Sequence, residues 1–297
     1  MSAQNLVRFP PDFVDRVLAL PWGALPRRGA GGTGERAGRH GAGLEFEEHR
    51  AYRPGDDLAR VDWQVFARTK KPFLKVQRIQ EAQRELVLVD LSASMDFGAE
   101  PKVDRALRIA AALALALAAR GASAEIIPLG AEEALGPVRL ERLAGARELL
   151  ATLERWRATA DEDELHRARL RLLERRSLAR APRAWILSDL YALAGWAQFS
   201  EQLSARALHP RLLRILDPEE RSPSLTEPVE WIDAETGERW IASDPEVALA
   251  GYAQRFAAHA ERLRQLAERH RLPLRELSEP AQDLAELVRF ERSRSAR

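Results

Sequence analysis

Apolar residues along this chain follow two alternating rhythms. Near-continuous apolar runs occur at "ELVLVD", "AEIIPLG", "RAWILSDL" and "PRLLRILD", and each has the length of a strand that is covered on both faces. Between these runs lie segments with helical spacing, such as residues 102–120 and 249–266. Strands that alternate with helices of this length predict an α/β fold, with a doubly wound, mostly parallel sheet and helices on both faces.

Two parts of the chain depart from this rhythm. "LEFEEHRAYRPGDD" and "FLKVQRIQEAQ" alternate like strands, and "VEWIDAETGERWIAS" has the pattern of a β-hairpin. Because isolated hairpins are marginally stable, we expect residues 44–84 and 228–243 to pair into one small β module. The predicted organisation is an N-terminal helix, a Gly/Arg loop and a β segment over residues 1–84, then the sheet domain over residues 85–297 with a hairpin insertion at about 218–244.

Composition excludes several classes of function. The net charge is +1 over 297 residues, so no global field marks nucleic acid or an anionic membrane as the partner. The absence of cysteine excludes disulfides, thiolate catalysis and Cys-ligated metals, and it fits a reducing compartment. The longest apolar run, "IAAALALALAA", is shorter than the roughly 18 residues of a membrane span, and the first residues lack a signal-peptide pattern. We therefore expect a cytoplasmic protein without a membrane span.

Small oxygen-bearing side chains follow the run "LVLVD". Asp90 ends that strand, and Ser92 and Ser94 come at alternate positions after it. Asp189 ends the next central strand, and Thr159 lies in the connection before it. The carboxyl ends of strands in such sheets are where ligands bind, and hydroxyl and carboxylate oxygens suit hard cations. The alternative is that the two serines only cap the following turn.

The same residues carry a family resemblance. "DLSASM" with Thr159 and Asp189 resembles the metal-ion-dependent adhesion site (MIDAS) of von Willebrand factor A domains. The stretch from "GAGLEFEEHRAYRPGDD" to "DLSASM", the "SDL" at 188–190 and the "DPEE…DAETGE" block resemble the domain of unknown function 58 family, over about residues 41–295. This resemblance implies a von Willebrand factor A-like fold.

The resemblance also implies a ligand set. Asp90, Ser92 and Ser94 would bind the metal directly, and Thr159 and Asp189 directly or through water. The cation would be Mg²⁺, or else Mn²⁺ or Ca²⁺. The family's loop commonly reads like Gly-x-Thr-Asp, whereas this chain has Ala160 after the threonine. Some members of the family have degenerate sites, and in that case the metal would be absent.

Two functions remain open at this stage. In the first, which we favour, the protein is a non-enzymatic, metal-dependent adaptor. A carboxylate of a partner protein completes the coordination of its bound cation. The resemblance implies a MoxR-type AAA+ ATPase and other von Willebrand A proteins as partners, in a chaperone-like assembly. The alternative is a metal-dependent phosphoesterase or other hydrolase, which needs a general base or a second metal. Only Asp96 and the acidic run 161–164 offer such groups near the predicted strand ends.

Overall fold

The computed structural model describes residues 8–23, 45–52, 61–78, 84–130, 135–175, 178, 183–225, 227–234 and 236–292. The chain divides into two compact units, one of residues 1–26 with 83–297 and one of residues 27–82.

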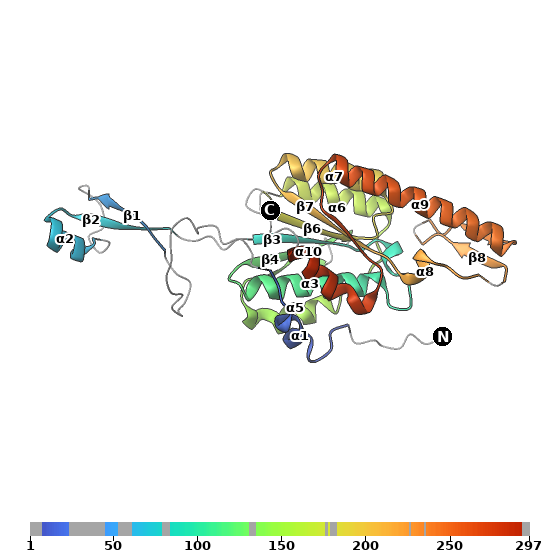
Figure 1. Cartoon of the computed structure of the whole chain (residues 1–297), viewed down its shortest axis with the longest axis horizontal. Coiled ribbons are helices and arrows are strands. Elements are labelled where there is room, and N and C mark those ends of the chain that lie inside the picture. The colour runs from blue at the N-terminus through green and yellow to red at the C-terminus, as the bar shows by residue number, and fades with distance from the viewer. Residues whose placement is uncertain are drawn as a thin grey trace. The chain divides into compact units, whose positions relative to one another are not determined.

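The larger unit is built on a six-stranded sheet (Figure 1). Its spatial order is β10-β7-β6-β3-β4-β5. All neighbouring strands pair in parallel except β5, which runs antiparallel at one edge. The strands are β3 (Arg84–Asp90), β4 (Ser123–Leu129), β5 (Val138–Leu140), β6 (Arg183–Ser188), β7 (His209–Ile215) and β10 (Leu274–Leu277).

Helices cover both faces of this sheet. The helices of the unit are α1 (Phe13–Ala19), α3 (Lys102–Ala118), α5 (Ala146–Leu153), α6 (Glu162–Glu174), α7 (Leu193–Ala205), α8 (Pro218–Arg221), α9 (Pro245–Arg269) and α10 (Asp283–Arg292). Successive side chains of a strand point to opposite faces. Val87 and Val89 therefore pack with α1, α3, α5 and α10, whereas Leu86 and Leu88 pack with α6, α7 and α9.

The predicted fold class is confirmed. The sheet is mostly parallel and doubly wound, and the apolar run that begins at Ile109 lies inside the buried helix α3. The acidic residues from Asp161 onward begin α6, where Asp161 and Glu164 form a reciprocal capping box. In the part of the chain that the structure describes, no helix is both long and apolar enough to cross a membrane.

The N-terminal helix departs from the predicted domain boundary. Residues 1–26 belong to the larger unit and not to the β segment that follows them. The reason is the buried side chain of Arg8, which pairs with Asp104 of α3 and donates to the carbonyl of Trp156 at 3.2 Å. Phe13 and Val17 of α1 complete the contact with the core.

The predicted single β module is wrong. Among the described residues, the two segments form separate two-stranded antiparallel sheets. In the smaller unit, β1 (Glu45–Ala51) pairs with β2 (Phe73–Arg78), and α2 (Trp63–Thr69) lies between them in sequence. In the larger unit, β8 (Val229–Ile232) pairs with β9 (Arg239–Ala242). The second hairpin gains its support from α9 instead, where Trp231 packs edge-on against Tyr252 at 6.3 Å between ring centroids.

Candidate functional site

The predicted site lies where the strand order of the sheet reverses. After β3 the chain continues to β4 on one side, and it later returns to place β6 on the other side. Val89 of β3 pairs with Leu187 of β6, so the residues that end these two parallel strands come together at one edge. A crevice at such a switch point is the usual ligand site of an open α/β sheet.

Asp90 is a buried carboxylate at the end of β3, only 1% exposed. Its Oδ1 accepts a hydrogen bond from the Ser92 backbone N–H at 2.9 Å, and its Oδ2 accepts one from the Ser188 hydroxyl at 2.5 Å. The pKa of Asp90 is raised from 3.8 to about 7, first by burial and then by the negative charge of Asp189. The hydrogen bonds from Ser188 and Ser92 lower the pKa and only partly offset these effects.

The two serines lie side by side on the turn that follows β3. Ser92 Oγ is 3.2 Å from Ser94 Oγ, and residues 93–95 form one turn of 3₁₀-helix. Ser92 is the N-cap of this turn but makes no side-chain capping bond to it, and Ser94 lies within the turn itself. The alternative that Ser92 only caps this turn therefore loses its main support. The two hydroxyls instead bond each other, and their oxygens lie beside Asp90.

The loop that carries Thr159 packs against this turn through its backbone. The N–H groups of Thr159 and Ala160 both donate to the carbonyl of Leu91 at 2.9 Å, and the carbonyl of Ala160 accepts from Ala93 at 2.8 Å. The Thr159 side chain is exposed, and Ala160 is buried against Gly130. The loop thus lies beside the turn of Ser92 and Ser94, as predicted. The role of the Thr159 hydroxyl as a metal ligand stays a prediction.

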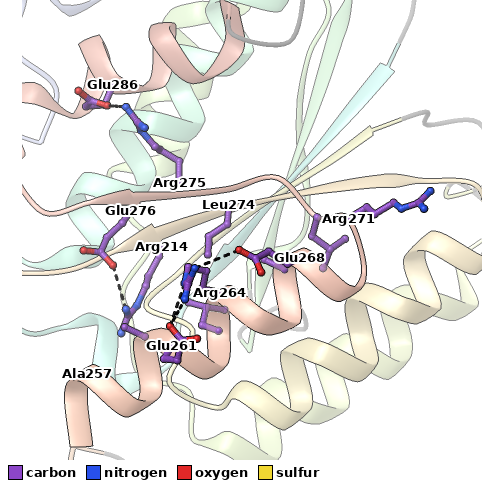
Figure 2. A pocket seen from close by; sticks show the side chains of 14 residues that line it. Arg214, Ala257, Glu261, Arg264, Glu268, Arg271, Leu274, Arg275, Glu276 and Glu286 are labelled. Atoms are coloured by element: carbon purple, nitrogen blue, oxygen red, sulfur yellow. Dashed lines mark hydrogen bonds and ion pairs between the residues drawn. The ribbon is translucent and has the colours of Figure 1, made fainter. Parts of the chain in front are cut away.

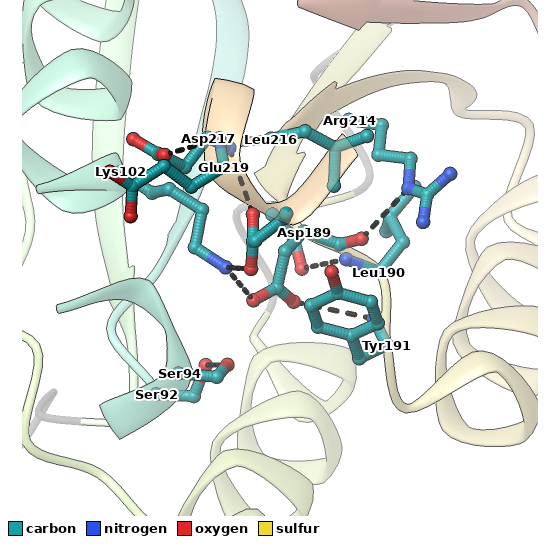
Figure 3. Close-up of polar contacts among 12 residues, drawn as sticks. Ser92, Ser94, Lys102, Asp189, Leu190, Tyr191, Arg214, Leu216, Asp217 and Glu219 are labelled. Carbon is teal, nitrogen blue, oxygen red and sulfur yellow. Dashed lines mark hydrogen bonds and ion pairs between the residues drawn. The ribbon is translucent and has the colours of Figure 1, made fainter. Parts of the chain in front are cut away.

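Asp189 follows β6 and is paired with a buried lysine. Its Oδ2 accepts from Lys102 Nζ at 2.9 Å, and the same ammonium donates to Glu220 Oε1 at 2.6 Å. Lys102 has no exposed surface, and its Nζ lies 5.1 Å from the centre of the Tyr191 ring. Figure 3 shows the ammonium directed at Asp189, with Ser92 and Ser94 on the neighbouring turn.

Electrostatics differ between the two aspartates. The Lys102 ammonium compensates the charge of Asp189, whereas Asp90 has only neutral donors among the described residues. Repulsion between two buried carboxylates is relieved by a proton or by a bound cation. The pKa of Asp90 is raised because this carboxylate is buried near the charge of Asp189 and has no cationic partner among the described residues.

Several residues of this edge escape prediction from the sequence. Ser188 donates to Asp90, and Lys102 donates to Asp189 and to Glu220. Lys102 and Glu220 come from α3 and α8, far from Asp189 in the sequence. One signal was available: a lysine in the first turn of a helix opposes the helix dipole and calls for a compensating partner. The structure adds that Leu190, which follows Asp189, adopts a left-handed conformation, φ 58°, which is strained for a leucine.

A cavity of about 510 Å³ opens at this edge. Ser94 and Tyr191 line it from the site, Glu162 lines it from the start of α6, and Asp233 and Ala234 line it from the turn between β8 and β9. The hairpin and the candidate site therefore line one recess.

The donor set fits a hard divalent cation. Asp90 and Asp189 supply carboxylate oxygens, and Ser92 and Ser94 supply hydroxyl oxygens, which are ligands that Mg²⁺ and Mn²⁺ accept. Within the described residues, no group of three or more His, Cys, Asp or Glu side chains could hold a metal. A cation at this edge would therefore depend on the serine hydroxyls and on water for the rest of its coordination.

A larger groove, of about 880 Å³, lies between α9 and β10 (Figure 2). Its charged side chains neutralise one another, since Arg264 pairs with Glu261 and Glu268 and Arg214 pairs with Glu276 at 3.2 Å. Among the described residues that line the groove, most arginines are thus paired with a glutamate, so the switch-point edge is the better candidate site.

Comparisons with known proteins place the chain in a family. It is 33% identical over 269 residues to the uncharacterized protein Rv1480 of Mycobacterium tuberculosis and to the uncharacterized protein Mb1516 of Mycobacterium bovis, covering 86% of this chain and 80% of each relative. The crystal structure of the conserved hypothetical protein BatB from Bacteroides thetaiotaomicron aligns with a TM-score of 0.40 at 11% identity, covering 73% of this chain and 100% of that chain. The family described as "Protein of unknown function DUF58" matches residues 48–262, and since that is more than half of the sequence, the chain belongs to this family.

Proposed function

We propose that this protein is a non-enzymatic adaptor that binds a partner protein through a divalent cation at the switch-point edge. The observation that carries the proposal is the pair of buried carboxylates, Asp90 and Asp189, near two serine hydroxyls whose oxygens lie 3.2 Å apart. One of these serines, Ser94, lines the cavity. Two buried carboxylates that repel each other favour a cation between them. Mg²⁺ is the proposed ion, with Mn²⁺ or Ca²⁺ as substitutes, and Thr159 is the proposed fifth ligand residue.

Charge explains why a partner carboxylate would be attracted. A divalent cation held by two carboxylates and neutral hydroxyls keeps little net charge, yet a further carboxylate at contact distance is still attracted to it. An oxygen-only site that keeps several waters binds Mg²⁺ weakly, so the partner's carboxylate would add to the affinity. The contact should therefore require metal.

Apolar side chains beside the cavity support a protein partner rather than a small substrate. Ile232, Trp240 and Ile241 of the hairpin are 54%, 50% and 76% exposed, and the turn of the same hairpin lines the cavity. Ile232 and Ile241 share one face of the hairpin, and Trp240 stands opposite Trp231 on the other face. Exposed apolar residues beside a recess are typical of protein–protein contacts. The family resemblance names the class of partner that we propose, a MoxR-type AAA+ ATPase, in the cytoplasm.

The test combines metal binding with capture of the partner. Titration with Mn²⁺ should show weak, saturable binding to the wild-type protein, and Asp90→Asn should abolish it. A purified MoxR-type ATPase from the same genome should be captured in Mg²⁺ and released by EDTA, and Ile241→Ser should weaken the capture. Glu268→Gln, at an exposed carboxylate outside the cavity, is the control and should change neither result.

Two outcomes would contradict the proposal. Capture that is unchanged by EDTA and by Asp90→Asn would remove the cation from the interface. Metal-dependent hydrolysis of a phosphate ester that is lost in Asp90→Asn would replace the adaptor with a hydrolase.

A further inference from the structure

Lys102 is the most unusual charged residue at the candidate site. It begins α3, has no exposed surface, and places Nζ 2.9 Å from Asp189 Oδ2 and 2.6 Å from Glu220 Oε1 (Figure 3). Glu220 in turn is held by α8, where its Oε2 accepts from the Asp217 N–H at 2.8 Å. The ammonium is therefore a fixed positive charge that contacts Asp189, and Asp189 is also a proposed metal ligand.

Helix formation does not explain this placement. A lysine in the first turn of a helix lies at the positive end of the helix dipole, and an ammonium with no exposed surface loses its hydration. Two carboxylates and the face of the Tyr191 ring, 5.1 Å from Nζ, compensate for these costs. The ammonium thus depends on Asp189 for part of its stabilisation, and any other cation that uses Asp189 must share it.

We infer that Lys102 is the resident counter-ion of the cation site and that it sets the affinity of the site by competing with the metal for Asp189. Glu220 then has a distinct role, because it holds the ammonium when Asp189 turns to a metal. This inference rests on the proposed cation site. It goes beyond that site in assigning the strength of metal binding to two residues that are not ligands.

The inference predicts effects of opposite sign. Lys102→Met keeps the length of the side chain and removes its charge, so Mn²⁺ should bind at least about tenfold more tightly. Glu220→Gln leaves Asp189 as the only carboxylate paired with the ammonium, so Mn²⁺ should bind severalfold more weakly. In the double variant the effect of Glu220→Gln should largely vanish, because Glu220 acts through Lys102.

Control variants distinguish this competition from a nonspecific effect of the protein's charge on metal affinity. Glu219→Gln removes the same charge one position away, at an exposed residue, and should leave the affinity nearly unchanged. Arg157→Met removes an exposed positive charge next to the loop of Thr159 and should also have little effect. Thermal melting without metal reports whether each variant is folded, and if Lys102→Met does not fold, the comparison of Glu220→Gln with Glu219→Gln decides.

The outcomes distinguish this inference from the proposed function. Wild-type binding of Mn²⁺ that Lys102→Met leaves equal or weaker, or equal effects of Glu220→Gln and Glu219→Gln, overturns the role of Lys102 and leaves the cation site standing. A lack of Mn²⁺ binding by every folded variant up to millimolar metal overturns both. Binding that appears only in Lys102→Met supports the inference.

Discussion

Replacing Asp90 with asparagine should stabilise the metal-free protein at pH 8. Asp90 is buried beside a second carboxylate, so its ionised form is disfavoured in the fold, whereas in the unfolded chain it ionises freely. Asparagine has nearly the same shape and carries no charge. Its amide oxygen can still accept the hydrogen bond from the Ser92 N–H, which Asp90 Oδ1 accepts at 2.9 Å.

The magnitude follows from the pKa of Asp90, which the fold raises from 3.8 to about 7. Each unit of difference between the folded and unfolded pKa corresponds to about 1.4 kcal/mol, so ionised Asp90 costs about 4 kcal/mol above pH 7. The amide nitrogen replaces Oδ2 as the partner of Ser188, and the disturbed hydrogen bond offsets about 1 kcal/mol of this gain. We expect a net stabilisation of about 2–3 kcal/mol at pH 8.

The pH dependence has a definite sign. Below pH 3.8 Asp90 is protonated in both states, and above about pH 7 it is ionised in both. Between these values only the folded state holds the proton, so the contribution of Asp90 to stability is present at low pH and is lost as the pH rises. The advantage of Asp90→Asn over the wild type should therefore be absent near pH 4 and should grow up to pH 7.

Urea denaturation in EDTA, followed by far-ultraviolet circular dichroism from pH 4 to pH 8, measures this difference. Asp189→Asn is the matched control, because it deprives the buried Lys102 of one partner and should destabilise the protein by about 3 kcal/mol. A loss of stability in Asp90→Asn at pH 8, or an advantage that does not change with pH, would refute the reasoning.

Two further predictions concern the packing of Gly130 beside the site and the buried ion pair of Arg105 with Asp283. In Gly130→Ala, where φ is +101°, the new Cβ would lie 2.4 Å from the Cβ of Ala160, so urea denaturation should show a loss of about 2 kcal/mol or more and Mn²⁺ should bind more weakly. Gly136→Ala, with φ +64° and nothing within 4 Å, should cost only about 1 kcal/mol, and equal losses in the two variants would contradict the steric explanation. In Arg105→Met, Asp283 loses a buried two-bond ion pair of 2.8 and 2.9 Å, so the free energy of unfolding should fall by about 3–5 kcal/mol, and a loss below about 1 kcal/mol would contradict this.

Local patterns in the sequence determined the elements and the motif. The apolar run that ends at Asp90 is typical of a strand covered on both faces, and the alanine-rich segment after Lys102 favours a helix. The alternate positions of Ser92 and Ser94 place both hydroxyls on one turn. Each of these features depends on residues within a few positions of one another, and a sequence records such relations directly.

Tertiary structure decided which other charged residues surround the predicted pair of Asp90 and Asp189. Asp189 lies beside Asp90 because β6 inserts next to β3, a pairing between segments about 100 residues apart. Lys102 and Glu220 join Asp189 from two other elements, and no spacing in the sequence announces that contact. The two hairpins illustrate the same limit, since strand alternation predicts that each pairs with something but does not say with what. Which distant strands pair and which distant side chains make contact depends on the packing of the whole core. These contacts are therefore known only from the folded structure.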